Sequence, residues 1–255
     1  MWKHFEVIKE ETYTHNPVLV IALSTSNPQY ILLYSQAREL ASYLLSKVKF
    51  EKIASLYSSA LSPAIEISKD GSIDLAGVHL YHHYNGRRDV ILVAGHSSPM
   101  GDEYEFSDAL LSFAKKIGIK ELVSIGARWS EEPVSAVDFP KVIGFSSDED
   151  GVEELKALEV EIQKEESAYF FSNTIVALAP KYSIRGLKLS VNHGEPRPHP
   201  KSLISLFKVL SKIMREDIEV GDLEKTSKEL EQAIRVASGT QDQVMGTMQQ
   251  GDIYR

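Results

Sequence analysis

The segment from Asp89 to Gly126 constrains the fold most strongly. It begins with a short apolar run, Val90–Ala94, of the kind found in strands that are buried on both faces. Four apolar residues then recur at helical spacing: Phe106, Leu110, Phe113 and Ile117. Gly118 ends that pattern, and a second apolar run, Leu122–Ile125, follows it. The sequence therefore predicts a β–α–β crossover between parallel strands.

Other segments extend this unit to a larger α/β domain. Further strands are predicted at Val18–Leu23, Lys52–Tyr57, Ala64–Ser68, Val78–Tyr84, Val142–Phe145, Leu158–Ile162 and Leu187–Val191. Further helices are predicted at Gln29–Lys47, Ser172–Tyr182 and Pro200–Met214. We expect Asp102 and Glu105 to form a capping box before the crossover helix, and an acidic turn at Asp148–Gly151. The predicted fold, over residues 1–220, is a three-layer αβα domain with helices on both faces of a mixed, partly parallel sheet.

The end of the sequence differs from this body. An amphipathic helix is predicted over residues 221–239, with Asp222 as its N-cap and Gly239 at its stop. Its apolar residues form one narrow stripe: Leu223, Leu230, Ile234 and Ala237. This stripe could pack on the chain's own domain or bundle with the same helix of other copies, and the sequence does not distinguish these two arrangements. Residues 240–255 are mostly polar and lack periodicity, so we expect a flexible tail.

The last three residues of this tail are Ile253, Tyr254 and Arg255. A hydrophobic residue, a tyrosine and any residue before a free carboxylate form a docking signal, because a receptor needs only a cation for the carboxylate and an apolar slot beside it. A sequence of this composition would end in this way by chance about 2% of the time, so the tripeptide needs support from the rest of the chain. We predict that these three residues bind a partner protein.

Composition excludes several classes of function. The net charge is −8 and no cluster of basic residues is interleaved with aromatics, which argues against nucleic-acid binding. No apolar run is long enough to span a membrane, and the first residues lack a signal-peptide core, so we expect a soluble cytoplasmic protein. The sequence contains no cysteine, and His82 and His83 would point to opposite faces of one strand. Neither a metal site nor a cofactor is predicted.

Four segments resemble the PAC2 family of proteasome assembly chaperones in their order and spacing. They are residues 49–57, 88–95, 116–126 and 194–203. The resemblance implies a three-layer αβα domain similar to the nucleoside phosphorylases, and homo-oligomers whose tails contact the α-ring of the proteasome core particle. It therefore implies a non-enzymatic protein that docks Ile253, Tyr254 and Arg255 in that ring, as an assembly chaperone or as an ATP-independent activator. The sequence does not separate these two roles.

The chain departs from the family at two turns where relatives usually carry glycines. The turn after the first strand is Ser24–Pro28, and the turn before the late helix is residues 167–173. A small-molecule pocket lined by those glycines would be lost in this chain.

An enzyme is the alternative prediction. Parallel strands bring their carboxyl ends to one edge of a sheet, where α/β enzymes bind ligands. Five polar residues follow or end the predicted strands: His96, Ser97, Arg128, His193 and Glu195. Together they would suit a hydrolase or a nucleoside-cleaving enzyme. The sequence contains no nucleophile elbow, phosphate-binding loop or zinc-binding helix, so we predict binding rather than catalysis.

Overall fold

The structure of the chain is a computed structural model. It describes residues 3–9, 11–24, 36–67, 69–129, 134, 139–164, 170–193, 199–234 and 236, with only the backbone for 127–129, 192 and 193. Within these residues, no helix is both long and apolar enough to cross a membrane.

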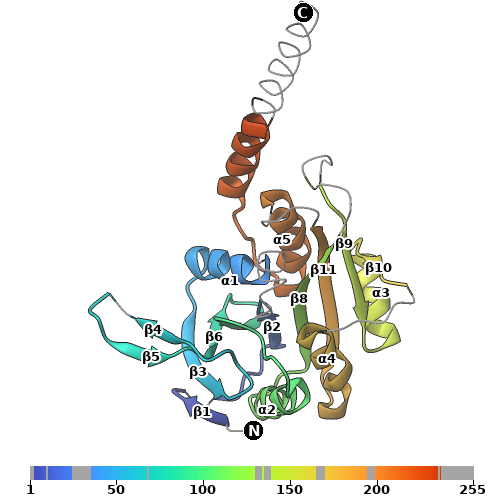
Figure 1. Ribbon diagram of the computed structural model, residues 1–255. Helices are drawn as coiled ribbons and strands as arrows, with labels where there is room; N and C mark the ends of the chain where they lie inside the picture. The colour runs from blue at the N-terminus through green and yellow to red at the C-terminus, as the bar shows by residue number, and fades with distance from the viewer. Residues whose placement is uncertain are drawn as a thin grey trace, which may run out of the picture.

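A nine-stranded mixed sheet forms the centre of the molecule, in the order β1-β3-β6-β7-β2-β8-β11-β9-β10 (Figure 1). Its strands are β1 (Lys3–Val7), β2 (Val18–Ala22), β3 (Glu51–Ser58), β6 (Val78–Tyr84), β7 (Asp89–Gly95), β8 (Glu121–Trp129), β9 (Val142–Ser146), β10 (Glu161–Ile162) and β11 (Arg185–His193). The four central strands β7, β2, β8 and β11 are parallel, and antiparallel pairings flank them on both sides. The predicted crossover joins β7 to β8, and β2 lies between these two strands.

Helices cover both faces of the sheet. One face carries α1 (Gln36–Lys47), α3 (Glu149–Ala157) and α5 (Pro200–Met214), and the other carries α2 (Glu103–Lys116), α4 (Phe171–Leu178) and the 3-10 turn η2 (Ala179–Tyr182). The fully buried strand β2 supplies Leu19 and Ile21 to one core and Val18 and Val20 to the other, as expected when side chains alternate across a strand. The predicted three-layer α/β fold is thus confirmed.

The acidic segment at Asp148–Gly151 is not a turn between two strands, as predicted, but the beginning of α3. The Asp148 carboxylate caps that helix by accepting a hydrogen bond of 2.7 Å from the backbone N–H of Gly151, and acidic residues in the first turn suit the helix dipole. Only β10 forms where a strand was predicted at Leu158–Ile162, because α3 extends to Ala157 and Leu158 is the C-cap of that helix.

Three further differences concern the ends of elements and short strands. Asp102 does not form the predicted capping box, because its backbone is left-handed, with φ 48°, and its side chain makes no capping hydrogen bond. The predicted start of the first helix, residues 29–35, lies outside the described residues. Two strands were not predicted from the sequence: β1, and β5 (Ile73–Leu75), which pairs with β4 (Ile65–Ile67) in a separate two-stranded sheet.

Arg88 joins three elements at the amino end of the parallel strands. Its guanidinium donates from Nε to the carbonyl of Asn16 (2.8 Å), from Nη2 to Glu121 Oε1 (2.9 Å) and from Nη1 to the carbonyl of Ile213. The last of these carbonyls lies at the C-terminal end of α5, where the helix dipole favours a cation. Arg88 therefore fixes α5 against the first residues of β7 and β8.

The two neighbouring histidines of β6 point to opposite faces of the sheet, as predicted. His82 stacks on Tyr13 and hydrogen-bonds through Nε2 to Asp89 Oδ1 at 2.8 Å. His83 lies against Phe50 on the other face. The two imidazoles therefore cannot chelate one ion together.

Candidate functional site

The predicted docking residues Ile253, Tyr254 and Arg255 lie outside the described residues, but the structure describes the helix that leads toward them. Residues 221–234 and 236 are helical, and Figure 1 shows this helix rising from the body above α1 and α5. A hydrogen bond of 2.7 Å from the Tyr43 hydroxyl to the carbonyl of Glu219 holds the segment just before it. The division of the chain into a body, a helix and a tail stays a prediction.

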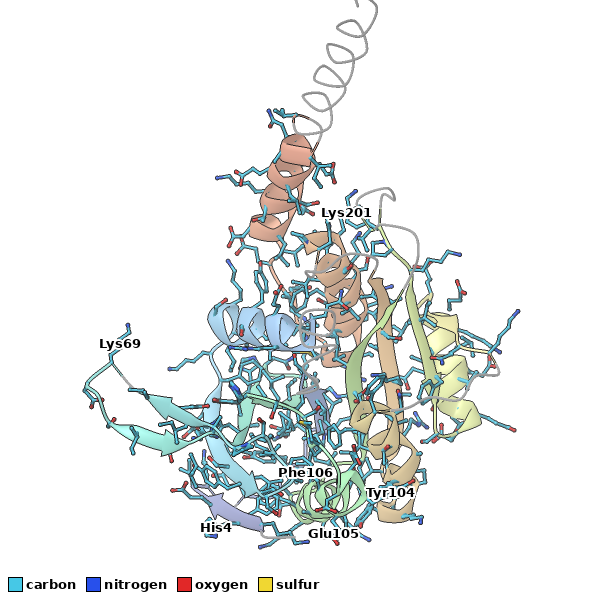
Figure 2. All side chains as sticks on the ribbon, viewed as in Figure 1. His4, Lys69, Tyr104, Glu105, Phe106 and Lys201 are labelled. Carbon is cyan, nitrogen blue, oxygen red and sulfur yellow. The ribbon has the colours of Figure 1, made fainter. Side chains whose placement is uncertain are left out.

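Two ion pairs hold the helix itself. Asp222, predicted as the N-cap, pairs with Lys47 of α1 instead. Further along the helix, Glu231 Oε1 lies 2.8 Å from Lys201 Nζ. Figure 2 labels Lys201 at the start of α5. The apolar stripe is used only in part, because Leu223 packs against the core whereas Leu230 and Ile234 remain 37% and 39% exposed. The helix is thus held to α1 near its start and to α5 at Glu231, while Leu230 and Ile234 leave apolar side chains exposed.

Four of the five residues predicted for an enzyme site lie at the carboxyl edge of the parallel strands. His96 is exposed and Ser97 is buried, both in the loop after β7. Arg128 and His193 belong to the last residues of the paired strands β8 and β11. Their side chains, like the whole of Glu195, lie outside the described part of the chain, so the convergence of these five residues stays a prediction.

A second feature, for which no function was predicted from the sequence, is the hairpin of β4 and β5. Figure 1 shows it projecting from the body, and Figure 2 labels Lys69 in its turn. Its register pairs Ile65 with Leu75 and Ile67 with Ile73, so that four aliphatic side chains share one face. Each is between 53% and 70% exposed. The acidic pair of Glu66 and Asp74 occupies the opposite face.

A third feature is a buried lysine in the central sheet. Lys188 of β11 is 4% exposed and points toward the α4 side of the sheet, because its neighbours Leu187 and Leu189 belong to the opposite core. Its Nζ has no hydrogen-bond partner among the described residues, and burial lowers the pKa of this ammonium group to about 7. Ser124, its direct partner in the register of β8, is also buried, and the described part of the chain offers its hydroxyl no hydrogen-bond partner.

Both missed features leave a signal in the sequence. The hairpin alternates aliphatic and acidic residues on each side of Asp70-Gly71, which is a strand pattern that repeats after a turn. Lys188 stands between two leucines in a strand that alternates apolar and polar residues, and a lysine in such a strand is more often on a solvated face. Only the position of α4 over that face shows that the residue is buried.

The fold matches solved structures at low sequence identity. Pyrococcus furiosus PbaB, an archaeal proteasome activator, aligns with a TM-score of 0.76 and 19% identity over 92% of this chain and 98% of that chain. Pyrococcus furiosus PbaA, an archaeal homolog of proteasome-assembly chaperone, aligns with a TM-score of 0.69 and 17% identity over 95% and 99%. A Mycobacterium tuberculosis proteasome-assembly chaperone homologue aligns with a TM-score of 0.69 and 17% identity over 86% of this chain and 94% of that chain. At these identities the likeness shows the fold alone.

Sequence comparison with curated proteins finds no match. The sequence profile of the PAC2 family, in contrast, matches residues 37–237. That range spans most of the sheet, the five α-helices packed on it and the beginning of the C-terminal helix. The resemblance inferred from four short segments is therefore confirmed over more than half of the sequence, and the chain belongs to the PAC2 family.

Proposed function

We propose that this chain is a non-enzymatic proteasome-binding protein that docks its C-terminal residues into the α-ring of the core particle. The observation that carries the proposal is the C-terminal helix, which is fixed to the body near its start and leads away from it toward a sequence that ends in Ile253-Tyr254-Arg255. Membership of the PAC2 family supports it, as do the proteasome-related descriptions of two proteins that share the fold.

Each residue of the tripeptide has a role in this proposal. The carboxylate of Arg255 pairs with a cation of the receptor, and the Tyr254 ring packs while its hydroxyl forms a hydrogen bond. Ile253 fills an apolar slot. One such tail is a weak ligand, so several linked copies that rebind at high effective concentration are needed for stable docking.

The hairpin of β4 and β5 offers a surface through which copies would associate. A two-stranded hairpin with one apolar face is marginally stable alone in water, and free strand edges tend to pair with another chain. The four aliphatic residues Ile65, Ile67, Ile73 and Leu75 form an uncharged face, which lets two chains of net charge −8 approach without repulsion at the contact. In the proposed oligomer, the arms of two copies cover each other's aliphatic faces.

Core-particle binding tests the docking of the tail. Full-length protein and a version ending at Asp252 would be compared by pull-down with the core particle of the same organism, with peptide hydrolysis followed in the same samples. Gln250→Ala serves as the matched control, because it alters the tail but keeps the tripeptide. We expect binding by the full-length protein and the control only, and a rise in hydrolysis would identify an activator rather than a chaperone.

If neither version binds, docking is contradicted, and ester and nucleoside substrates would test the alternative based on His96, Ser97, Arg128, His193 and Glu195.

The oligomer is tested separately by light scattering after size exclusion. Replacing Ile67 and Ile73 by lysine places two charges on the aliphatic face, and we expect the mass to fall toward 28.5 kDa. The control is Glu66→Lys, which adds a similar change of charge on the opposite face of the same strand and should leave the mass unchanged. Equal masses for all three proteins would exclude the hairpin as the contact.

A further inference from the structure

Polar groups from three elements meet beside Gly126, near the carboxyl ends of the parallel strands. Lys188 comes from β11, Gly126 from β8, and Ser172 from the first turn of α4. A Cβ added to Gly126 would overlap the Nζ of Lys188 and would lie 3.5 Å from the Ser172 hydroxyl oxygen. The absence of a side chain at Gly126 is therefore what allows the ammonium group to lie there, with the hydroxyl nearby.

The Lys188 ammonium is not compensated by the described part of the chain. Its Nζ is fully buried and makes no hydrogen bond there. An isolated buried cation is costly, and proteins normally offset that cost with a counter-charge and hydrogen-bond acceptors. Ser124 and Ser172 carry hydroxyls on the same side of the sheet, but a hydroxyl supplies no charge. The missing component is an anion.

Helix α4 adds an electrostatic reason for an anion at this place. Its first residue is Phe171, and the backbone N–H groups of Phe171 and Ser172 have no acceptor inside the helix, whereas those of Asn173 and Thr174 donate to the Phe170 carbonyl. The positive end of the helix dipole favours negative charge at such a position. Phe171 packs edge-to-face on Phe106 of α2, which Figure 2 labels, and this contact encloses the start of α4.

We propose that Lys188, Ser172 and the first turn of α4 bind a small oxyanion, meaning the carboxylate or phosphate group of a small molecule. The ammonium supplies charge, the Ser172 hydroxyl and the backbone N–H groups donate hydrogen bonds, and Gly126 lets the Lys188 side chain reach the site. Ser124 is placed to donate a further bond to the Lys188 end of the site. This inference stands apart from tail docking, because none of these residues belongs to the C-terminal helix or tail.

Calorimetric titration of the full-length protein with inorganic phosphate and, separately, acetate at constant ionic strength tests the site. We expect saturable binding of at least one anion by the wild-type protein. A loss of affinity of roughly tenfold or more is expected in Lys188→Met and in Gly126→Ala, whose methyl group would displace Nζ. Ser172→Ala should weaken binding without disturbing the sheet, and Lys181→Met, at an exposed position of η2, should bind as the wild type does. Binding of phosphate alone would narrow the ligand class to phosphates.

Three results would overturn the proposal. One is the absence of binding by the wild-type protein, and another is equal affinity in Lys188→Met, which would indicate an adventitious ion only. The third requires an NMR assignment of the Lys188 ε-methylene group. If its signal shifts on changing Glu165 and Glu166 to glutamine but not on adding either anion, a carboxylate of the chain itself is the partner.

Discussion

Arg88 and Lys188 are two cations buried to the same extent, each 4% exposed, one at the amino end of the parallel strands and the other within β11. Arg88, at the amino end, donates hydrogen bonds to Asn16, Glu121 and Ile213. Lys188, the fourth of the nine residues of β11, has no hydrogen-bond partner among the described residues. The fold therefore supplies the partners of Arg88, whereas the partner of Lys188 has to come from outside the described residues.

The buried polar groups around Arg88 have a structural role. At the amino end, an ion pair and two backbone carbonyls hold the chain together, and the neighbouring Asp89 is satisfied in the same way by His82 and by the backbone N–H of His15. Burial acts to raise the pKa of the Asp89 carboxyl, but the hydrogen bonds from His82 and His15 outweigh it and leave the pKa lowered. Lys188 of β11, in contrast, is a buried charge with no partner in the described ranges, and its Nζ lies beside Gly126 of β8.

The largest effect is expected from Arg88→Met. The substitution leaves Glu121 as an uncompensated, mostly buried charge and removes the donors for the carbonyls of Asn16 and Ile213. Breaking a buried pair in this way costs about 3–5 kcal/mol. We expect a loss of this size in the free energy of unfolding, measured by urea denaturation, and little change in Arg87→Met at the exposed neighbouring position. A loss below about 1 kcal/mol would mean that Arg88 does not hold these elements together.

Lys188→Met is expected to act in the opposite direction. Burial lowers the pKa of Lys188 from its usual 10.5 to about 7, so between these values the unfolded chain binds more protons and stability rises with pH. The penalty is therefore fully present below about pH 7 and disappears near pH 10.5. In a buffer free of phosphate and carboxylates, the variant should be more stable by about 2–4 kcal/mol at pH 7. Denaturation curves from pH 6.5 to 10.5 should show this gain shrinking, and a pH-independent difference from the wild type would contradict it.

The smallest effect is expected at Phe170, the residue before α4. Its backbone has φ 80° and ψ 149°, a region that side-chain-bearing residues rarely occupy, and its ring is largely exposed. Phe170→Gly should therefore raise the free energy of unfolding by about 1 kcal/mol. Phe170→Ala is the control, because it removes the ring but keeps the strain. An equal change in both variants would attribute the effect to the ring and not to the backbone.

Local sequence patterns predict much of this fold because local and tertiary preferences agree in its regular elements. Helix α5 has the predicted bounds, Pro200–Met214, since proline suits the first helical position and the apolar residues repeat along the helix. The error at α3 has a physical reason. Acidic residues followed by glycine occur both in turns and in the first turn of a helix, and the Asp148 cap that decides between them is a three-dimensional feature.

The candidate sites were less predictable than the fold. The pattern of Ile65, Ile67, Ile73 and Leu75 indicates strands, but only the register shows that the four side chains share one exposed face. Lys188 is buried because α4 covers β11, a contact between segments that no local pattern specifies. The tripeptide Ile253-Tyr254-Arg255 is predicted from residue chemistry and family resemblance, and its docking stays a proposal.

The most direct measurement for the central claim compares the chain with a version that carries one additional alanine after Arg255. Every residue of the chain is retained, and only the position of the terminal carboxylate changes. In a pull-down with the core particle, the proposal predicts that the unmodified chain is retained and that the extended chain is lost to the background level. Equal retention of both chains would contradict docking through the terminal carboxylate.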